Sequence, residues 1–189
     1  MLVVPVAAYM PKGAVGGTIT TVFGPASFNT TDSGYGSYTE VVVFNVGTLS
    51  AASGAPKIRI SVSYSRLDSG VVVTAYIGQS TGTNNISFTG DQVQLKWAGA
   101  GSFTSGGSIL NYTSDFVTLA QNFDNTKAYS VAIQNIGTGV SLNRGTLSGA
   151  TGVYLYYKSG SDAATTSKSG YTLLWSNTAQ LVTEIDVST

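Results

Sequence analysis

The feature that most constrains this chain is a repeated pattern of short segments in which apolar and polar residues alternate. The clearest example is residues 57–65, where alternation runs without an error. An extended strand exposes successive side chains on opposite faces, so this segment would present one apolar face and one polar face. The apolar face would carry Ile58, Ile60, Val62 and Tyr64, and the polar face Lys57, Arg59, Ser61 and Ser63. We therefore expect a strand with one face in water.

Similar runs recur along the chain, separated by turn residues. They cover residues 39–46, 71–77, 91–97, 116–120, 127–134, 152–158 and 181–187. Asp68, Ser69 and Gly70 separate the first strand from residues 71–77 and have the composition of a tight turn. We expect these two segments to form an antiparallel hairpin.

Helix is disfavoured throughout the sequence. No window of ordinary helix length keeps apolar residues at spacings of three and four without Gly or β-branched interruption, and the chain contains 23 Gly in 189 residues. We predict an all-β fold with almost no helix: an antiparallel β-sandwich of about nine to eleven strands, jelly-roll-like in connectivity. A barrel or a three-sheet variant stays open. Residues 18–189 would form the single sandwich domain, preceded by residues 1–17.

The composition excludes several classes of function. Nine Lys and Arg balance nine Asp and Glu, only 10% of residues are charged, and the positive residues are scattered singly, so we expect no nucleic-acid binding. The chain has no Cys and no His, which removes thiolate chemistry and the most common general base. We predict that the protein is not an enzyme and uses no cofactor.

Carboxylates are the remaining candidates for chemistry. Glu184 and Asp186 are close enough to suggest a glycosidase pair, but at positions i and i+2 of a strand they fit a solvated outer face better. Loop aspartates could offer ligands to calcium, yet no Asp-x-Asp-x-Asp spacing occurs. We expect neither catalysis nor a bound metal.

Residues 1–17 begin with an apolar stretch, Met1 to Met10, and end in a Gly-rich link. The stretch lacks a basic region, contains Pro5 and is too short to span a bilayer, so we expect no membrane insertion. It is either the first strand of the domain or an arm that docks on a neighbouring subunit. In the second case Leu2, Val3, Val4 and Val6 would form the interface.

Aromatic residues are abundant, with eleven Tyr, seven Phe and two Trp. In residues 153–157 Tyr154 and Tyr156 share one face and apolar residues occupy the other, so both faces need a cover. One face would pack on the opposite sheet, and the other would be covered by a loop of the same chain or by a second subunit. If a second subunit covers it, Tyr154 and Tyr156 are interface residues. Trp97, Trp175 and Tyr171 suggest the alternative of a sugar-stacking site for a cell-surface glycan.

The C-terminal third of the chain resembles the β-sandwich ends of bacteriophage virion proteins, namely head decoration proteins and the tips of tail or head fibres. The resemblance rests on residues 127–133, 152–157, 159–162 and 181–187. It implies a non-enzymatic structural protein of the virion, assembled in the host cytoplasm, whose partners are itself, as a homo-oligomer with a trimer favoured, and other virion subunits. Two alternatives remain: a carbohydrate- or receptor-binding module, and an extracellular filament subunit that exchanges a donor strand.

Overall fold

The computed structural model describes residues 17–25, 30–35, 37–50, 52–64, 70–106, 110–137, 140–146 and 152–189, which form fifteen β-strands and no helix. Sheet I contains, in spatial order, β1 (Ile19–Phe23), β15 (Val182–Ser188), β4 (Lys57–Tyr64) and β8 (Leu110–Thr113), with β9 (Val117–Thr118) also paired to β4. Sheet II contains β13 (Thr172–Ser176), β12 (Val153–Ser159), β3 (Tyr38–Phe44), β10 (Tyr129–Ile136), β5 (Val72–Gln79) and β6 (Val93–Gln94), with β7 (Phe103–Thr104) also paired to β5. Sheet III contains β14 (Thr178–Gln180), β11 (Val140–Thr146) and β2 (Thr30–Tyr35). Every pairing is antiparallel.

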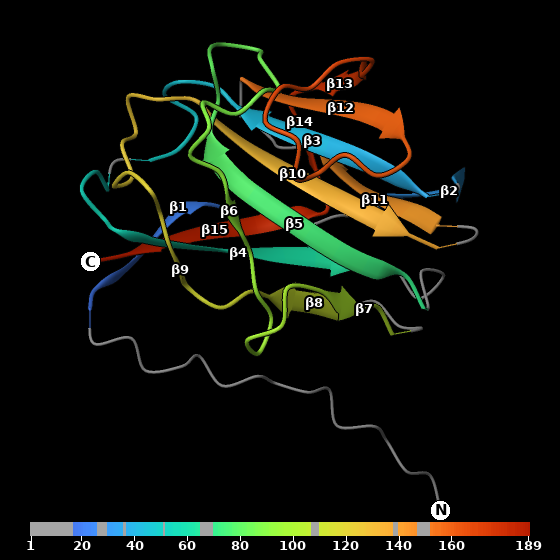
Figure 1. Cartoon of the computed structure of the whole chain (residues 1–189), viewed down its shortest axis with the longest axis horizontal. Helices are drawn as coiled ribbons and strands as arrows, with labels where there is room; N and C mark the ends of the chain where they lie inside the picture. Colours follow the sequence, from blue (N-terminus) through green and yellow to red (C-terminus); the bar gives the residue numbers. More distant parts are fainter. Residues whose placement is uncertain are drawn as a thin grey trace, which may run out of the picture.

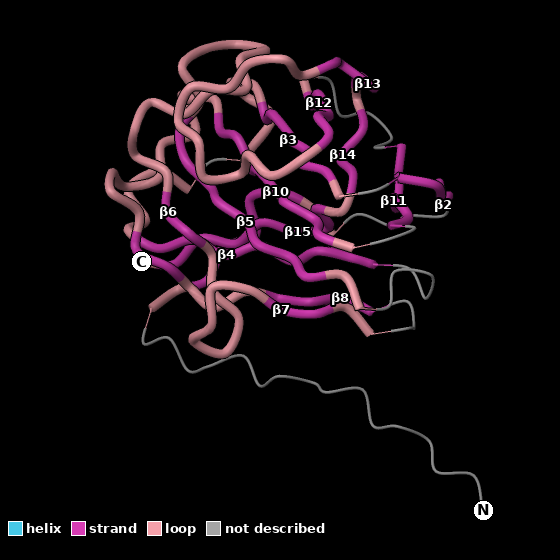
Figure 2. The backbone as a smooth tube through the Cα atoms, turned by 45° about the vertical axis from the view of Figure 1, so that its right-hand side comes forward, coloured by secondary structure: helices cyan, strands magenta, loops and turns pink. Residues whose placement is uncertain are grey.

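Sheets I and II form the two layers of a β-sandwich (Figure 1). The chain crosses repeatedly between the layers: β1 lies in sheet I, β3 in sheet II, β4 in sheet I and β5 in sheet II. Sheet III continues the β3–β10 ribbon, because β2 directly precedes β3 and β11 follows β10 (Figure 2). The ribbon therefore runs beyond the sandwich at one end.

The predicted fold class is confirmed: the described residues are all-β and form an antiparallel sandwich. The fifteen strands exceed the expected nine to eleven. Four of them are very short: β6, β7 and β9 have two residues each and β14 has three, too few to show a periodic pattern. None of the described segments forms a helix long and apolar enough to cross a membrane. Residues 1–16 and the apolar arm within them lie outside the described residues.

The predicted hairpin between residues 57–65 and 71–77 is wrong. Its two strands, β4 and β5, lie in different sheets, where β4 pairs with β15 and β5 with β10. A turn signal shows that the chain reverses direction but leaves open whether the next strand pairs with the last one or crosses to the opposite sheet.

The main core lies between the two sheets. Ile58, Ile60 and Val62 of β4 are fully buried there, as the alternation of residues 57–65 predicts. The other face of β4 is drier than expected, because Arg59 is only 4% exposed and Ser63 is also buried. The expectation of a wholly wet face is therefore wrong at these positions.

Sheet II is covered on both faces. Its outer face carries a second apolar cluster built on Val41, Val43, Phe88, Ala132 and Ala163. The cover comes from loops of the same chain, because the amide of Phe88 donates to the carbonyl of Thr166 at 2.9 Å and so joins the segment after β5 to the one after β12.

Candidate functional site

Four of the aromatic residues singled out from the sequence come together in one part of the fold. Tyr154 and Tyr156 lie on β12, Trp175 lies on β13, and Tyr171 immediately precedes β13. These two strands form an antiparallel hairpin at the end of sheet II. We call β12, β13 and the loop of residues 160–171 between them the edge hairpin.

The two faces of the edge hairpin differ in their surroundings. On the inner face Val153 and Leu155 are fully buried in the main core, and Trp175, which pairs with Leu155, packs against the same core. On the outer face Tyr154 and Tyr156 are half-buried in the second cluster. Tyr171 packs in the same outer cluster as Tyr154 and Tyr156, so only Trp175 of this group lies against the main core.

The outer tyrosines are covered partly by their own chain. The hydroxyl of Tyr156 donates to the carbonyl oxygen of Asn84 at 3.0 Å. Asn84 is held by a reciprocal pair of bonds with Asn45: the Asn45 side-chain amide donates to Asn84 Oδ1 at 2.6 Å, and the Asn84 main-chain amide donates to Asn45 Oδ1 at 2.8 Å. The segment after β5 is therefore fixed beside Tyr156, and Tyr154 and Tyr156 stay half-buried.

Lys168 stabilises the loop of the edge hairpin. Lys168 is 8% exposed, and its ammonium donates to the carbonyl oxygens of Asp162 at 2.7 Å and Ala163 at 3.1 Å. It also lies 5.1 Å from the centre of the Phe88 ring, within cation–π range. Burial is the main reason that the pKa of Lys168 is lowered to about 8, although the nearby Asp162 carboxylate opposes the change. With both carbonyls in its hydrogen-bonding shell, the ammonium serves to hold the loop closed.

Asp162 connects this loop to the sheet. Its carboxylate accepts a hydrogen bond from Lys158 Nζ at 3.1 Å, and its amide donates to Thr39 Oγ1 at 2.9 Å. Burial alone would raise the pKa of Asp162, but hydrogen bonds from Thr165 and Lys158 outweigh it and lower the pKa. The pKa of the neighbouring Tyr171 phenol is raised, mainly by burial. Sequence reasoning missed the contact of Lys158 and Lys168 with Asp162, because one lysine lies on β12, the other two residues lie in the loop, and their spacing matches no motif.

The outer strand of the edge hairpin is exposed. Among the described strands β13 pairs only with β12, and it stands at the end of the strand order of sheet II. Leu173 is 49% exposed, and Thr172 and Ser176 are exposed as well. Residues 171–180 contain no charged residue and no Pro, the two common devices that protect a sheet edge from pairing.

Two other edges of the sandwich contact further segments of the chain. The carbonyl of Val22 in β1 accepts a hydrogen bond from the amide of Ser50 at 2.9 Å. At the opposite side β6 of sheet II lies against β9 of sheet I. Within the described residues β13 has exposed residues at Thr172 and Leu173 and is therefore a candidate to accept another strand.

Trp97 does not belong to this site. It is 4% exposed, and its ring centre lies 4.8 Å from that of Phe103, which in turn stacks on Tyr112 at 4.2 Å. The suggestion that Trp97 stacks on a sugar is therefore wrong, because its ring is part of the main core. Leu2, Val3, Val4 and Val6 lie outside the described residues.

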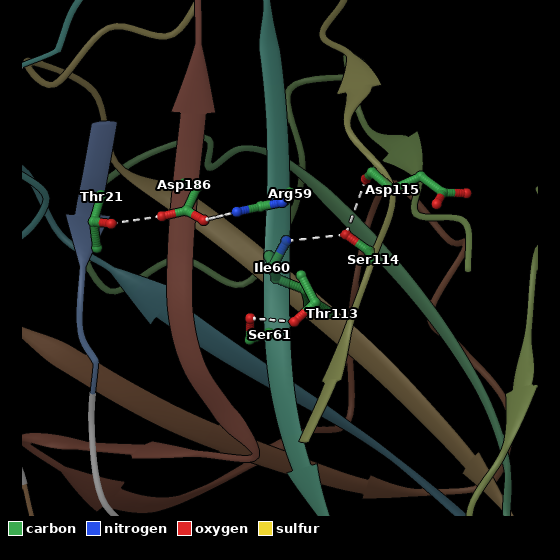
Figure 3. Close-up of polar contacts among 8 residues, drawn as sticks. All are labelled: Thr21, Arg59, Ile60, Ser61, Thr113, Ser114, Asp115 and Asp186. Carbon is green, nitrogen blue, oxygen red and sulfur yellow. Dashed lines mark hydrogen bonds and ion pairs between the residues drawn. The ribbon is translucent and has the colours of Figure 1, made fainter. Parts of the chain in front are cut away.

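The carboxylate pair considered for catalysis is also accounted for. The expectation that Asp186 is solvated is wrong, because its side chain is only 2% exposed. Its Oδ2 accepts hydrogen bonds from Arg59 Nε at 2.9 Å and from Arg59 Nη2 at 2.7 Å (Figure 3). Its Oδ1 accepts a bond from Thr21 Oγ1 at 2.7 Å. Within the described residues no group of three or more acidic side chains gathers in a way that could hold a metal ion.

An open, polar depression of about 530 Å³ lies at the end of β5 and β10. It is lined by Gln79, Ala120, Gln121, Asn122, Asp124 and Lys127. Asp124 is committed to the turn, since its Oδ1 accepts bonds from the amide and hydroxyl of Thr126, and these bonds lower its pKa. The lining has no aromatic ring on which a sugar could stack.

Neither a comparison with protein-family models nor a comparison with curated protein sequences finds a match for this chain.

Proposed function

We propose that this protein is a non-enzymatic structural subunit, a component of a virion shell or fibre, that acts by pairing its sheet edge with other subunits. The observation that carries the proposal is the exposed, uncharged edge at β13, with Leu173 at 49% exposure. Unprotected sheet edges of this kind are templates for strand pairing between chains, and soluble monomers normally protect them.

The connectivity supports a jelly roll. Without the edge hairpin and the short extra strands, sheet I has the order β1-β15-β4-β8 and sheet II the order β3-β10-β5-β6. Successive strands alternate between the layers except for β5 and β6, which are neighbours. This is the arrangement expected of two interlocked Greek keys, and it recurs in viral capsid proteins and in lectins. The edge hairpin is then an addition inserted between the last two strands of the jelly roll.

The surface chemistry favours the structural role over the lectin role. Of the two Trp residues, Trp97 is buried and Trp175 packs against the main core. The chain also lacks the His and Cys that most hydrolytic mechanisms use. A charge-poor chain with an apolar edge suits permanent association, because interface cores are depleted in charge.

Self-association of the full chain tests the proposal. Light scattering behind a sizing column, over a wide concentration range, should give a mass of several chains, with a trimer favoured. Leu173→Lys should reduce this to the mass of one chain, because pairing would require the new ammonium to be desolvated. Val46→Lys, at a residue 55% exposed in the turn after β3, is the matched control and should leave the mass unchanged.

Two results would contradict the proposal. One is a single-chain mass for the unmodified protein at every concentration. The other is an assembly whose mass Leu173→Lys and Val46→Lys leave equally unchanged, since the edge would then have no part in it.

A further inference from the structure

We propose that the strand added to β13 is the apolar segment Leu2 to Tyr9 of a second copy of this chain. The proposal rests on the self-assembly proposed above and names the part of the partner that docks. It is argued from the exposed edge, from the place where the segment leaves the sandwich, and from the position of a single proline.

The point of departure is fixed by the structure. A Cβ atom on Gly17 would lie 1.5 Å from the main-chain oxygen of Thr189, so only glycine fits where the chain enters the sandwich. The amide of Thr189 donates to the carbonyl of Thr18 at 3.3 Å, which places this entry beside the end of β15 in sheet I. The segment therefore starts from the layer opposite to the one that carries β13.

The length is sufficient to reach a neighbouring subunit. Sixteen residues precede Gly17. At about 3.3 Å per extended residue they span up to about 50 Å, more than the length of any strand in the fold. Leu2 to Tyr9 can lie along β13 while the Gly-rich remainder crosses between subunits.

The two surfaces match in charge. The first charged residue of the segment is Lys12, so residues 1–11 are uncharged, as are residues 171–180 around β13. Neither partner would have to desolvate a charge on pairing. Leu2, Val4 and Val6 fall on one face of an extended strand, where they would continue the apolar surface beside Leu173.

Pro5 decides which side of the segment can pair. In a strand the N–H groups of alternate residues point to the same neighbour, so Leu2, Val4 and Val6 would donate to β13 while the odd positions face away. Pro5 occupies an odd position, where its missing N–H is not needed. The segment can thus join a sheet as its last strand, and it blocks the addition of a further one.

A matched pair of proline variants tests which side pairs. In the full chain Val6→Pro removes an N–H that donates to β13, whereas Ala7→Pro removes one that faces away. We expect Val6→Pro to weaken self-association by about tenfold or more, since the β13 carbonyl is left without its donor. Ala7→Pro should leave the association constant unchanged. Circular dichroism should show the same sheet content for both.

Disulfide trapping identifies the contact directly, because the chain has no native Cys. Full-length Val4→Cys and Leu173→Cys proteins, mixed and oxidised mildly, should form a mixed disulfide between two chains. A mixture of Val4→Cys with Val72→Cys, at a β5 residue 38% exposed, is the control and should stay uncross-linked.

Several outcomes would overturn the inference. Rapid homodimer formation by Leu173→Cys alone would indicate that two β13 edges pair with each other. A disulfide within single chains of the Val4→Cys/Leu173→Cys double variant, without cross-linking in the mixture, would place the segment on its own subunit. If Leu173→Lys abolishes assembly but Val6→Pro and Ala7→Pro behave alike, the edge still mediates assembly and the segment does not. A single-chain mass for the unmodified protein would instead remove the proposed function itself.

Discussion

Two buried carboxyl groups in this sandwich have opposite surroundings. Asp186, on the outer face of sheet I, is 2% exposed and accepts hydrogen bonds from Arg59 and Thr21 (Figure 3). Glu40, on β3 of sheet II, is 1% exposed, and neither of its carboxylate oxygens has a hydrogen-bond partner among the described residues. The two groups are almost equally buried, so the difference between them lies in their partners.

The local pairing explains why Glu40 has no such partner. It lies between Ile133 of β10 and Tyr157 of β12, and both of these side chains pack in the main core. Burial alone raises the pKa of Glu40 well above its ordinary value of 4.5. A buried ion costs several kcal/mol unless it is paired and hydrogen-bonded, so burial favours the neutral form of this carboxyl group. The two carboxyl groups thus differ in their partners and not in their burial.

The largest effect should follow from breaking the pair at Asp186. Arg59→Met removes both donors, together with a guanidinium that lies 4.5 Å from the ring centre of Phe116, and leaves a buried carboxylate alone. The free energy of unfolding should fall by about 3–5 kcal/mol. Urea denaturation at pH 7 measures the change.

The control replaces both partners. Because Arg59→Met with Asp186→Leu leaves no unpaired charge, most of the lost stability should return. A double variant that is no more stable than Arg59→Met alone would mean that the ion pair itself, and not the avoided charge, stabilises sheet I.

The opposite change is expected at the unpaired group. Glu40→Leu replaces a buried polar side chain with an apolar one of similar size and should raise the free energy of unfolding at pH 7 by about 1–3 kcal/mol. Glu40→Gln keeps a buried polar group and should gain less. Urea denaturation of both variants checks this, and a loss of stability in Glu40→Leu would show that the carboxyl group stabilises the folded state.

The pH dependence of the free energy of unfolding gives a second test of Glu40. The pKa of Glu40 is higher in the folded state than its ordinary value of 4.5, so the folded state holds this proton more tightly. The protonation of Glu40 therefore contributes fully to the free energy of unfolding below pH 4.5. This contribution is lost as the pH rises from 4.5 through the pKa of Glu40 in the folded state. Within that window stability should fall by at most about 1.4 kcal/mol per pH unit from this group.

Glu40→Gln should remove that slope, whereas Arg59→Met with Asp186→Leu should keep it. Urea midpoints between pH 4 and pH 9 provide the measurement. An identical profile in Glu40→Gln and the unmodified protein would show that Glu40 does not bind this proton.

The candidate site could be predicted only in part. Tyr154, Tyr156, Tyr171 and Trp175 stand out in the sequence, because aromatic residues are conspicuous in any strand. That they belong to one hairpin follows from the pairing of Leu155 with Trp175. Leu173 carries no signal of its own, since its exposure depends on β13 being the last strand of sheet II.

By itself the sequence determined the kind of structure and the kinds of chemistry open to it. Alternation in residues 57–65 requires an extended strand whatever its neighbours, and the absence of His and Cys holds in any fold. The tertiary structure alone decided which strands pair and which faces are covered. Arg59 and Asp186 are 127 positions apart, and their contact depends on β4 and β15 pairing in one register. The physical reason is that periodicity is a local property of the chain, whereas pairing and burial depend on contacts between segments distant in sequence.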